Sequence, residues 1–397
     1  SDYRSAVEEE EEEKVLQRMA TQTKFPEEIT YEILYNLRVK SLSRFKCVSK
    51  RWRSIISSKE FIKRHLEKSN TDPDITRHRI LLRLHHRCLQ QNTVLLHSLR
   101  PLLYGPNATF DNLPQQTNLL TRVWGSCNGL TLMFVNNARL VLLNLSSRKL
   151  KIVPPFPEEG GEYAPRHDTD RFIYGLGYDE SADDYKVVCI YTLSNSKPHR
   201  TQMYSSKTDS WKKIEDFDKG IVPVEDSGKF VNGKLHWLAK DENGGRDHEI
   251  VALDLVEGKY EIMARPENFS NSVPYQPILG DLGGYLSLIG HVFVSDTAGN
   301  MLDTSVWVMK EYGVRESWTK IWTLSDFHDP KNCTRGALPL CFRDNGDIAV
   351  AFGSSIVVYN GKNKLREIRG AIVNDIIESL VYVESLVSPF GDEELGH

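Results

Sequence analysis

The sequence predicts a small all-α module of three to four short helices, followed by a large all-β domain of propeller-like repeats. Two observations lead to this fold class. Apolar residues recur at helical spacing between residues 24 and 68, and from about residue 76 short strands alternate with Gly, Asn and Asp turns. We therefore divide the chain into a leader (1–23), a helical module (24–68), a β domain (76–389) and a tail (390–397).

The leader is strongly acidic and lacks the basic-then-apolar order of a secretion signal. Glu8 to Glu13 form an unbroken run, which is typical of a solvated helix or a disordered segment. Met19-Ala20-Thr21 resembles the first residues of a natural protein, so we expect residues 1–18 to be either an upstream extension or an added segment.

Short helices account for the apolar spacing of the helical module. Pro26 suits the first turn of a helix, since its missing N–H costs nothing there, and Ser41 and Ser49 are suited to cap the next two. The apolar groups of each helix share one face: Ile29, Ile33, Leu34 and Leu37; Leu42, Phe45 and Val48; Trp52, Ile55 and Ile56; Phe61, Ile62 and Leu66. Helices this short cannot bury all these groups among themselves, so the surplus must pack on a permanent partner or on the rest of the chain.

Charge is unevenly distributed along the chain. The net charge is −4, which gives no electrostatic case for binding nucleic acid. Between Arg38 and Lys68, however, eleven Lys or Arg residues stand against two Glu. This basic segment is either a solvated helix face or a dock for an acidic partner.

The β domain contains one recurring hairpin, in which an apolar strand and a polar turn precede an aromatic residue or Leu. Leu150, Trp211, Tyr260, Trp318 and Leu365 occupy that position, at intervals of 61, 49, 58 and 47 residues. The hairpins are 140–153, 201–214, 250–263, 305–321 and 356–368, and the strands between them are 129–135, 184–193, 233–239, 285–294 and 346–352.

Four strands in roughly 50 residues is the period of a Kelch-type propeller blade. Strands at 79–84 and 93–99 would begin a first blade, and 376–389 is expected to return as a strand that closes the ring. We expect five to six blades and favour six; a pair of β-sandwiches is the alternative. We expect Trp211, Trp237 and Trp318 to lie in the blade core. We expect Asn128-Gly129 and Asn232-Gly233 to form turns with positive φ.

The helical module resembles the F-box. The matching residues keep their spacing throughout and are Phe25-Pro26, Ile33-Leu34, Leu37-Arg38-Val39-Lys40-Ser41-Leu42 and Arg44-Phe45-Lys46-Cys47-Val48-Ser49-Lys50-Arg51-Trp52. Two positions depart from the family pattern: Phe25 replaces a leucine, and Arg38 replaces a proline that would begin the second helix.

This resemblance implies a Skp-type adaptor as partner, and through it a cullin–RING ligase. An F-box lays its apolar helix faces against the adaptor, whose acidic character would suit the basic segment. The implied contacts are Phe25, Pro26, Ile29, Ile33, Leu34, Leu37, Val39, Leu42, Phe45, Val48, Lys50 and Trp52. Among them we expect Leu34, Leu42, Val48 and Trp52 to be the main anchors.

The β domain resembles the F-box-associated (Kelch-like) domain of plants. The resemblance rests on the blocks Gly125–Leu130, Asn144-Leu145, Pro154-Pro155, Gly175–Asp179, Asp183–Val188, Val231–Trp237 and Tyr382–Leu386. It implies the substrate-recognition subunit of an SCF (Skp–cullin–F-box) ubiquitin ligase. The alternative is a non-catalytic Kelch-like binding scaffold, or a sugar-binding module, that does not act in a ligase.

Sequence patterns of catalysis are missing. The chain contains no G-x-S-x-G elbow, no H-E-x-x-H and no Gly-rich phosphate loop, and His85-His86 with Cys88 forms no convincing ligand set. The six scattered Cys favour buried reduced thiols over zinc or disulfides, and no apolar run approaches the roughly 20 residues that cross a bilayer. We expect no catalysis, metal, cofactor or membrane span, and a protein of the cytoplasm and/or nucleus.

Target binding is expected at the loops of the propeller. The longest polar connections are 157–172, 194–200, 218–228, 240–249, 265–281 and 325–336. The candidate contacts to an anion or a peptide are Arg166, His167, Arg171, Arg246 and Arg335. Ordinary solvated loop charges are the alternative interpretation of each.

Overall fold

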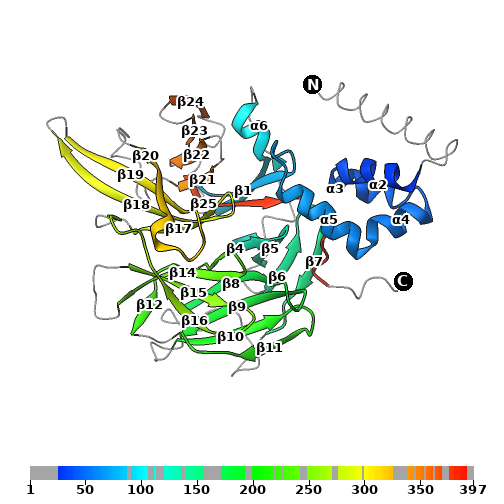
Figure 1. The fold of residues 1–397 in the computed structure, drawn as a ribbon, viewed down its shortest axis with the longest axis horizontal. Helices are drawn as coiled ribbons and strands as arrows, with labels where there is room; N and C mark the ends of the chain where they lie inside the picture. The colour runs from blue at the N-terminus through cyan, green and yellow to red at the C-terminus, as the bar shows by residue number, and fades with distance from the viewer. Residues whose placement is uncertain are drawn as a thin grey trace.

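The computed structural model describes residues 26–390 with internal gaps. The gaps are 87–90, 106–110, 113–119, 136–138, 156–170, 193–198, 218–219, 226, 242–247, 271–275, 297–298, 325–337, 343–345, 353–354, 361–362 and 369–374. Within the described part an all-helical module lies beside an all-β propeller (Figure 1).

From residue 26 onward, where the structure describes the module, it contains four helices: α2 (Glu27–Asn36), α3 (Val39–Phe45), α4 (Lys50–Ser57) and α5 (Lys59–Asn70). As predicted, Ser49 caps a helix: its Oγ accepts a hydrogen bond from the backbone N–H of Trp52 at 3.1 Å. The prediction that Ser41 caps a helix was wrong, because Ser41 lies inside α3. Arg38 instead takes an extended backbone after α2 and turns the chain directly into α3, without a linker for Ser41 to cap.

The described residues of the β domain form six separate antiparallel sheets. Each sheet is one blade. The first blade contains β25 (Asp375–Val383), β1 (His78–His86), β2 (Gln91–Ser98) and β3 (Asp111–Asn112), and the second contains β4 (Leu120–Cys127), β5 (Leu130–Val135), β6 (Arg139–Asn144) and β7 (Lys149–Ile152). The third blade contains β8 (Arg171–Asp179), β9 (Asp184–Thr192), β10 (Arg200–Ser205) and β11 (Ser210–Lys213), and the fourth contains β12 (Ile221–Pro223), β13 (Lys229–Val231), β14 (Lys234–Asp241), β15 (His248–Asp254) and β16 (Tyr260–Met263). The fifth blade contains β17 (Ile278–Leu282), β18 (Tyr285–Asp296), β19 (Gly299–Met309) and β20 (Trp318–Leu324), and the sixth contains β21 (Leu338–Phe342), β22 (Asp347–Phe352), β23 (Ser355–Asn360) and β24 (Asn363–Ile368). A short helix, α6 (Leu99–Tyr104), follows β2, and a 3₁₀ turn, η2 (Arg315–Ser317), precedes β20.

The six sheets form a closed ring, so the prediction of a six-bladed propeller is confirmed and the β-sandwich alternative is wrong. The innermost strands contact one another in ring order, β25 to β4, β8, β13, β17, β21 and back to β25. As predicted, the C-terminal strand closes the ring: β25 pairs with β1, with Val383 opposite His78. The predicted strand 376–389 is too long, however, because β25 ends at Val383 and the following residues leave the sheet.

The apolar core lies between neighbouring blades. Trp237 and Trp318 are buried as predicted, whereas Trp211 is only half-buried and its Nε1–H donates to the carbonyl of Pro154 at 2.6 Å. Leu150, at the equivalent place in its own blade, is 40% exposed, so the recurring position does not always lie in the core. Both Asn-Gly pairs form turns with positive φ, as predicted.

The thiols only partly follow the prediction. Cys127, Cys189 and Cys341 are buried, and burial raises the pKa of the Cys127 and Cys189 thiols. Cys47 is exposed, which corrects the expectation of burial, because it lies in the solvent-facing turn after α3. The remaining two cysteines, Cys88 and Cys333, lie outside the described residues.

The propeller has two distinct faces. At one face, which we call the turn face, tight turns join the first strand of a blade to the second, as at Asn128-Gly129 and Asn232-Gly233. At the opposite face, which we call the connection face, second strands lead to third strands and one blade leads to the next, as between Ile152 of β7 and Arg171 of β8. Because β25 runs in the same sense as β4, its end at Val383 lies at the turn face, next to the start of β1.

Candidate functional site

The helical module sorts its apolar residues into an interior and a surface. Four of the predicted adaptor contacts are buried, namely Leu34, Val39, Leu42 and Phe45. Three are half-buried, namely Ile33, Leu37 and Trp52, and four are exposed, namely Pro26, Ile29, Val48 and Lys50. The twelfth, Phe25, lies outside the described residues. The predicted contacts therefore do not form one continuous surface.

Two of the four expected anchors belong to the interior. Leu34 and Leu42 have no exposed surface and pack with Phe61 inside the module. A partner can reach Val48, which is 46% exposed, and the edge of Trp52, whose ring lies 5.2 Å from that of Phe45. Leu34 and Leu42 can influence binding only through the stability of the helices.

Exposed cations surround the accessible apolar groups. Ten of the eleven Lys and Arg residues of the basic segment are exposed, Lys46 being half-buried. Arg51 lies 3.5 Å from Glu27 and Lys68 lies 3.9 Å from Glu32, both as loose surface ion pairs, and Lys59 pairs with Asp183 of the propeller. The module therefore presents exposed Ile29 and Val48 within a predominantly basic surface, which suits an acidic, partly apolar partner.

The other side of the module is attached to the propeller. In Figure 1, α5 lies on the side of the module nearest the sheets, where it contacts β25. Ile62 and Leu66 of α5 pack against the apolar core of the second and third blades, and Lys59 forms an ion pair with Asp183 of a turn between β8 and β9. Part of the surplus apolar surface predicted from the sequence is thus buried on the rest of the chain.

Buried Arg77, between α5 and β1, ties the two parts together. Its guanidinium donates to the carbonyl of Tyr35 in α2 at 2.5 Å and to Ser69 Oγ in α5 at 3.1 Å. Burial lowers the pKa of Arg77, although the guanidinium stays charged at any physiological pH. A charged donor that joins two helices to the start of the propeller fixes their relative position.

Five of the six predicted target-binding loops join strand ends at the connection face. The segments 157–172, 265–281 and 325–336 connect successive blades, and 194–200 and 240–249 connect second strands to third strands. The sixth, 218–228, is not a simple loop, because it contains β12, which pairs with β14 in the fourth blade. Four of the five candidate contacts lie outside the described residues: Arg166, His167, Arg246 and Arg335. The fifth, Arg171, begins β8, and its side chain is not described. These five assignments stay predictions.

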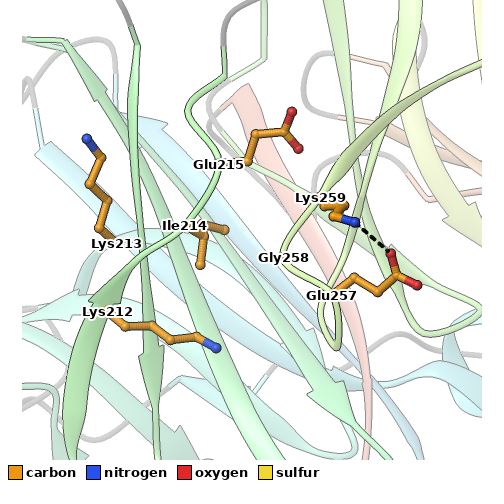
Figure 2. A pocket seen from close by; sticks show the side chains of 7 residues that line it. All are labelled: Lys212, Lys213, Ile214, Glu215, Glu257, Gly258 and Lys259. Carbon is orange, nitrogen blue, oxygen red and sulfur yellow. Dashed lines mark ion pairs between the residues drawn. The ribbon is translucent and has the colours of Figure 1, made fainter.

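A shallow groove on the rim of the third and fourth blades was not foreseen from the sequence. Its volume is about 470 Å³, and it is lined by Lys212, Lys213, Ile214, Glu215, Glu257, Gly258 and Lys259 (Figure 2). The charges largely compensate one another: Lys259 lies 3.8 Å from Glu257, and Glu215 accepts the backbone N–H of Tyr260 at 2.9 Å. The groove combines residues of two blades, so no local sequence pattern could have indicated it.

The described residues contain no group of His, Cys, Asp and Glu side chains that could hold a metal ion. Within the same ranges, no helix has both the length and the apolar content needed to cross a membrane.

Comparison with known proteins assigns both parts of the chain. Residues 23–64 match the F-box domain, and residues 97–389 match the F-box associated beta propeller domain. Among the similar curated proteins of Arabidopsis thaliana, F-box/kelch-repeat protein At3g23880 is 28% identical over 92% of this chain and 95% of its own length. F-box protein CPR1 is 30% identical over 75% of this chain and 72% of its own length. The chain therefore belongs to the F-box proteins that carry an F-box-associated β-propeller domain.

Proposed function

We propose that this chain is the substrate-recognition subunit of an SCF E3 ubiquitin ligase. In this role the F-box binds a Skp-type adaptor, and through it a cullin, while the propeller binds the protein to be ubiquitinated. F-box domains generally bind such adaptors. Ubiquitin transfer then belongs to the other subunits, and this chain contributes recognition and placement of the target.

The observation that supports this proposal best is how the F-box is presented. Its exposed apolar residues, Ile29 and Val48, lie within the basic surface, while α5 and Arg77 hold the module on the propeller. The longest propeller connections join strand ends at the opposite, connection face. One molecule can therefore carry an adaptor at the turn face and a target at the connection face without competition between them.

A matched pair of substitutions tests adaptor binding. Val48→Asp places a carboxylate in the accessible part of the F-box, and Val256→Asp makes the same change at a propeller turn where Val256 is 59% exposed. We expect Val48→Asp to reduce co-purification of a Skp-type adaptor at least tenfold, and Val256→Asp to leave it unchanged. Failure of the wild-type chain to bind the adaptor would refute the proposal.

The abundance of the target distinguishes a ligase subunit from a scaffold that acts outside a ligase. Proximity labelling by the wild-type chain with the proteasome blocked would identify candidate targets. A ligase target accumulates when Val48→Asp replaces the wild type, whereas a protein merely held by a scaffold does not. We also propose that target recruitment takes place in the cytoplasm and/or nucleus, and imaging of the chain fused to a fluorescent protein tests that location.

The target contacts are a narrower part of the proposal. We assign them to the connection face, with Arg166, His167, Arg171, Arg246 and Arg335 as candidates, because Arg and His recognise anions and peptide carbonyls. Simultaneous alanine substitution of all five should abolish target capture while adaptor binding persists. Undiminished capture would exclude these residues.

A further inference from the structure

The apolar core of the F-box is completed by a residue from the other end of the chain. Leu386 is 5% exposed and packs in the same cluster as Leu34, Leu42 and Phe61 of the helices. It lies just beyond β25, in a segment that leaves the sheet at the turn face and runs from Glu384 to Phe390. We call these residues the C-terminal segment. Its next residue, Val387, is also buried but packs in the core of the second and third blades.

The propeller holds this segment by specific hydrogen bonds. Buried Asn144, at the end of β6, donates from its Nδ2 to the carbonyl of Ser385 at 3.0 Å and to that of Val387 at 2.8 Å. Its Oδ1 accepts the backbone N–H groups of Ser146 and Ser147, which fixes the turn to β7. The two carbonyls on either side of Leu386 are therefore held by a single propeller side chain, which sets the direction in which Leu386 points.

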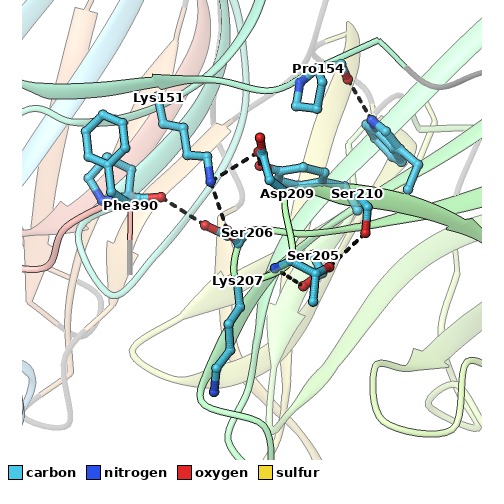
Figure 3. A network of polar contacts seen from close by, with 12 residues as sticks. Lys151, Pro154, Ser205, Ser206, Lys207, Asp209, Ser210 and Phe390 are labelled. Atoms are coloured by element: carbon cyan, nitrogen blue, oxygen red, sulfur yellow. Dashed lines mark hydrogen bonds and ion pairs between the residues drawn. The ribbon is translucent and has the colours of Figure 1, made fainter. Parts of the chain in front are cut away.

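A second anchor lies between the second and third blades (Figure 3). Ser206 Oγ donates to the carbonyl of Pro389 at 2.9 Å, and the backbone carbonyl of Ser206 accepts from Lys151 Nζ of β7 at 2.8 Å. Lys151 also lies 3.2 Å from Asp209 of the same turn. The far end of the C-terminal segment is thus held only where two neighbouring blades meet correctly.

The near end of the segment is bound to the linker that follows the F-box. The backbone N–H of Glu384 donates to the carbonyl of Arg77 at 2.9 Å, and the Glu384 carboxylate lies 2.6 Å from Nε of Arg79. Arg77 is the residue whose guanidinium holds Tyr35 and Ser69 of the F-box. The start of the segment is therefore bonded to the linker that follows the F-box and to β1, which pairs with β25 to close the ring.

From these contacts we propose that the C-terminal segment makes formation of the F-box conditional on closure of the propeller. The residues at the end of the chain first complete the ring through β25 and then place Leu386 in the F-box core. A chain with an open or truncated ring has an F-box without its complete core. On the proposed function, such a chain does not recruit the ligase efficiently, so adaptor binding reports a fully folded receptor.

Hydrogen–deuterium exchange on the full chain tests this proposal without any partner. Leu386→Ala should speed exchange of the amides of α2 and α5 at least tenfold while those of the fourth and fifth blades keep their wild-type rates. The matched control is Leu279→Ala, since Leu279 is fully buried in β17, far from the F-box cluster. That variant should speed exchange in its own blade and leave α2 and α5 unchanged.

A second variant separates the hydrogen bonds from the packing. Asn144→Asp keeps the oxygen that accepts from Ser146 and Ser147 but has no N–H to donate to the C-terminal segment. The hydrogen bonds of the Asn144 side chain reach the C-terminal segment and its own turn, and none reaches a helix of the described residues. Faster exchange of α2 in this variant, with unchanged exchange in the second blade, would therefore be transmitted through the segment. We expect a several-fold increase.

The outcomes distinguish this inference from the proposed function. Unchanged exchange of α2 and α5 in both Leu386→Ala and Asn144→Asp overturns the inference, whatever the adaptor does. Faster exchange together with wild-type adaptor affinity would overturn the link to recruitment. Failure of the wild-type chain to bind a Skp-type adaptor would refute the proposed function, while the exchange rates would still decide whether the segment completes the F-box.

Discussion

Replacing Leu34 by Ala should weaken adaptor binding through the stability of the F-box and not through a lost contact. Leu34 has no exposed surface and packs with Leu42, Phe61 and Leu386. Truncating a fully buried Leu to Ala costs about 2–5 kcal/mol, because the side chain loses its burial and leaves a cavity. Helices of 7 to 12 residues have little stability of their own, so this loss falls on a module that depends on tertiary packing.

The adaptor affinity follows from the folded fraction of the module. When a binding-competent state is only partly populated, the apparent Kd rises by the inverse of that population. Once the substitution has consumed the reserve stability of the module, each further loss of about 1.4 kcal/mol weakens binding tenfold. Leu34→Ala should therefore increase amide exchange in α2 and raise the apparent Kd together.

Ile29→Ala is the matched control on the same helix. Ile29 is 46% exposed, so its truncation should change the stability of the module by less than about 0.5 kcal/mol. If Ile29 contacts the adaptor, its loss weakens binding by about 1–2 kcal/mol without any change in exchange. Amide exchange of the free protein and adaptor affinity by biolayer interferometry separate the two effects. Reduced affinity of Leu34→Ala with unchanged exchange would refute the reasoning, because Leu34 would then act as a contact.

Two further predictions concern the turn face and pH. Gly129→Ala should destabilise the protein far more than Gly233→Ala in a urea titration: both glycines have positive φ, but a Cβ at Gly129 would lie 2.7 Å from a carbonyl oxygen of β25, whereas a Cβ at Gly233 meets open space. Equal losses would contradict the close packing there. Burial of His65 lowers its pKa from 6.5 to about 4, so the unfolded chain takes up the proton first and stability falls as pH drops from about 6.5 towards 4. The urea midpoint of His65→Gln should fall less steeply between pH 7 and pH 5 than that of the wild type, and parallel curves would contradict the assignment.

The blade architecture could be predicted because it is built from contacts between neighbours in sequence. Each outer hairpin joins two adjacent strands through a polar turn, as in β10 and β11, where Tyr204 pairs with Trp211. Such local pairs leave a period of roughly 50 residues that the sequence displays directly. Even the closing strand could be assigned, because a first blade that begins with strands 79–84 and 93–99 is incomplete and needs a strand from the end of the chain.

The interior of the F-box could not be predicted in the same way. Helical spacing places Ile29, Ile33 and Leu34 near one another on α2, yet Leu34 is buried and Ile29 is exposed. Which part of an apolar face becomes the interior depends on how the four helices cross, and this information is not contained in any one helix. The four expected anchors were chosen because they are apolar and stand at F-box motif positions, and neither property distinguishes the core from the surface. Leu34 and Leu42 consequently lie in the core, whereas Val48 and the edge of Trp52 are accessible.

The contact between Leu386 and the F-box escaped prediction for another reason: it depends on ring closure, which brings the two ends of the described chain together. β25 and β1 are antiparallel neighbours, and Val383 at the end of β25 lies opposite His78 at the start of β1. The residues that precede His78 and those that follow Val383 must therefore leave the sheet at the same place. The first group leads back to α5, and the second group is the C-terminal segment. Closing a propeller with its last strand thus brings an N-terminal module and the C-terminal residues side by side, and a buried leucine at that point becomes part of the module's core.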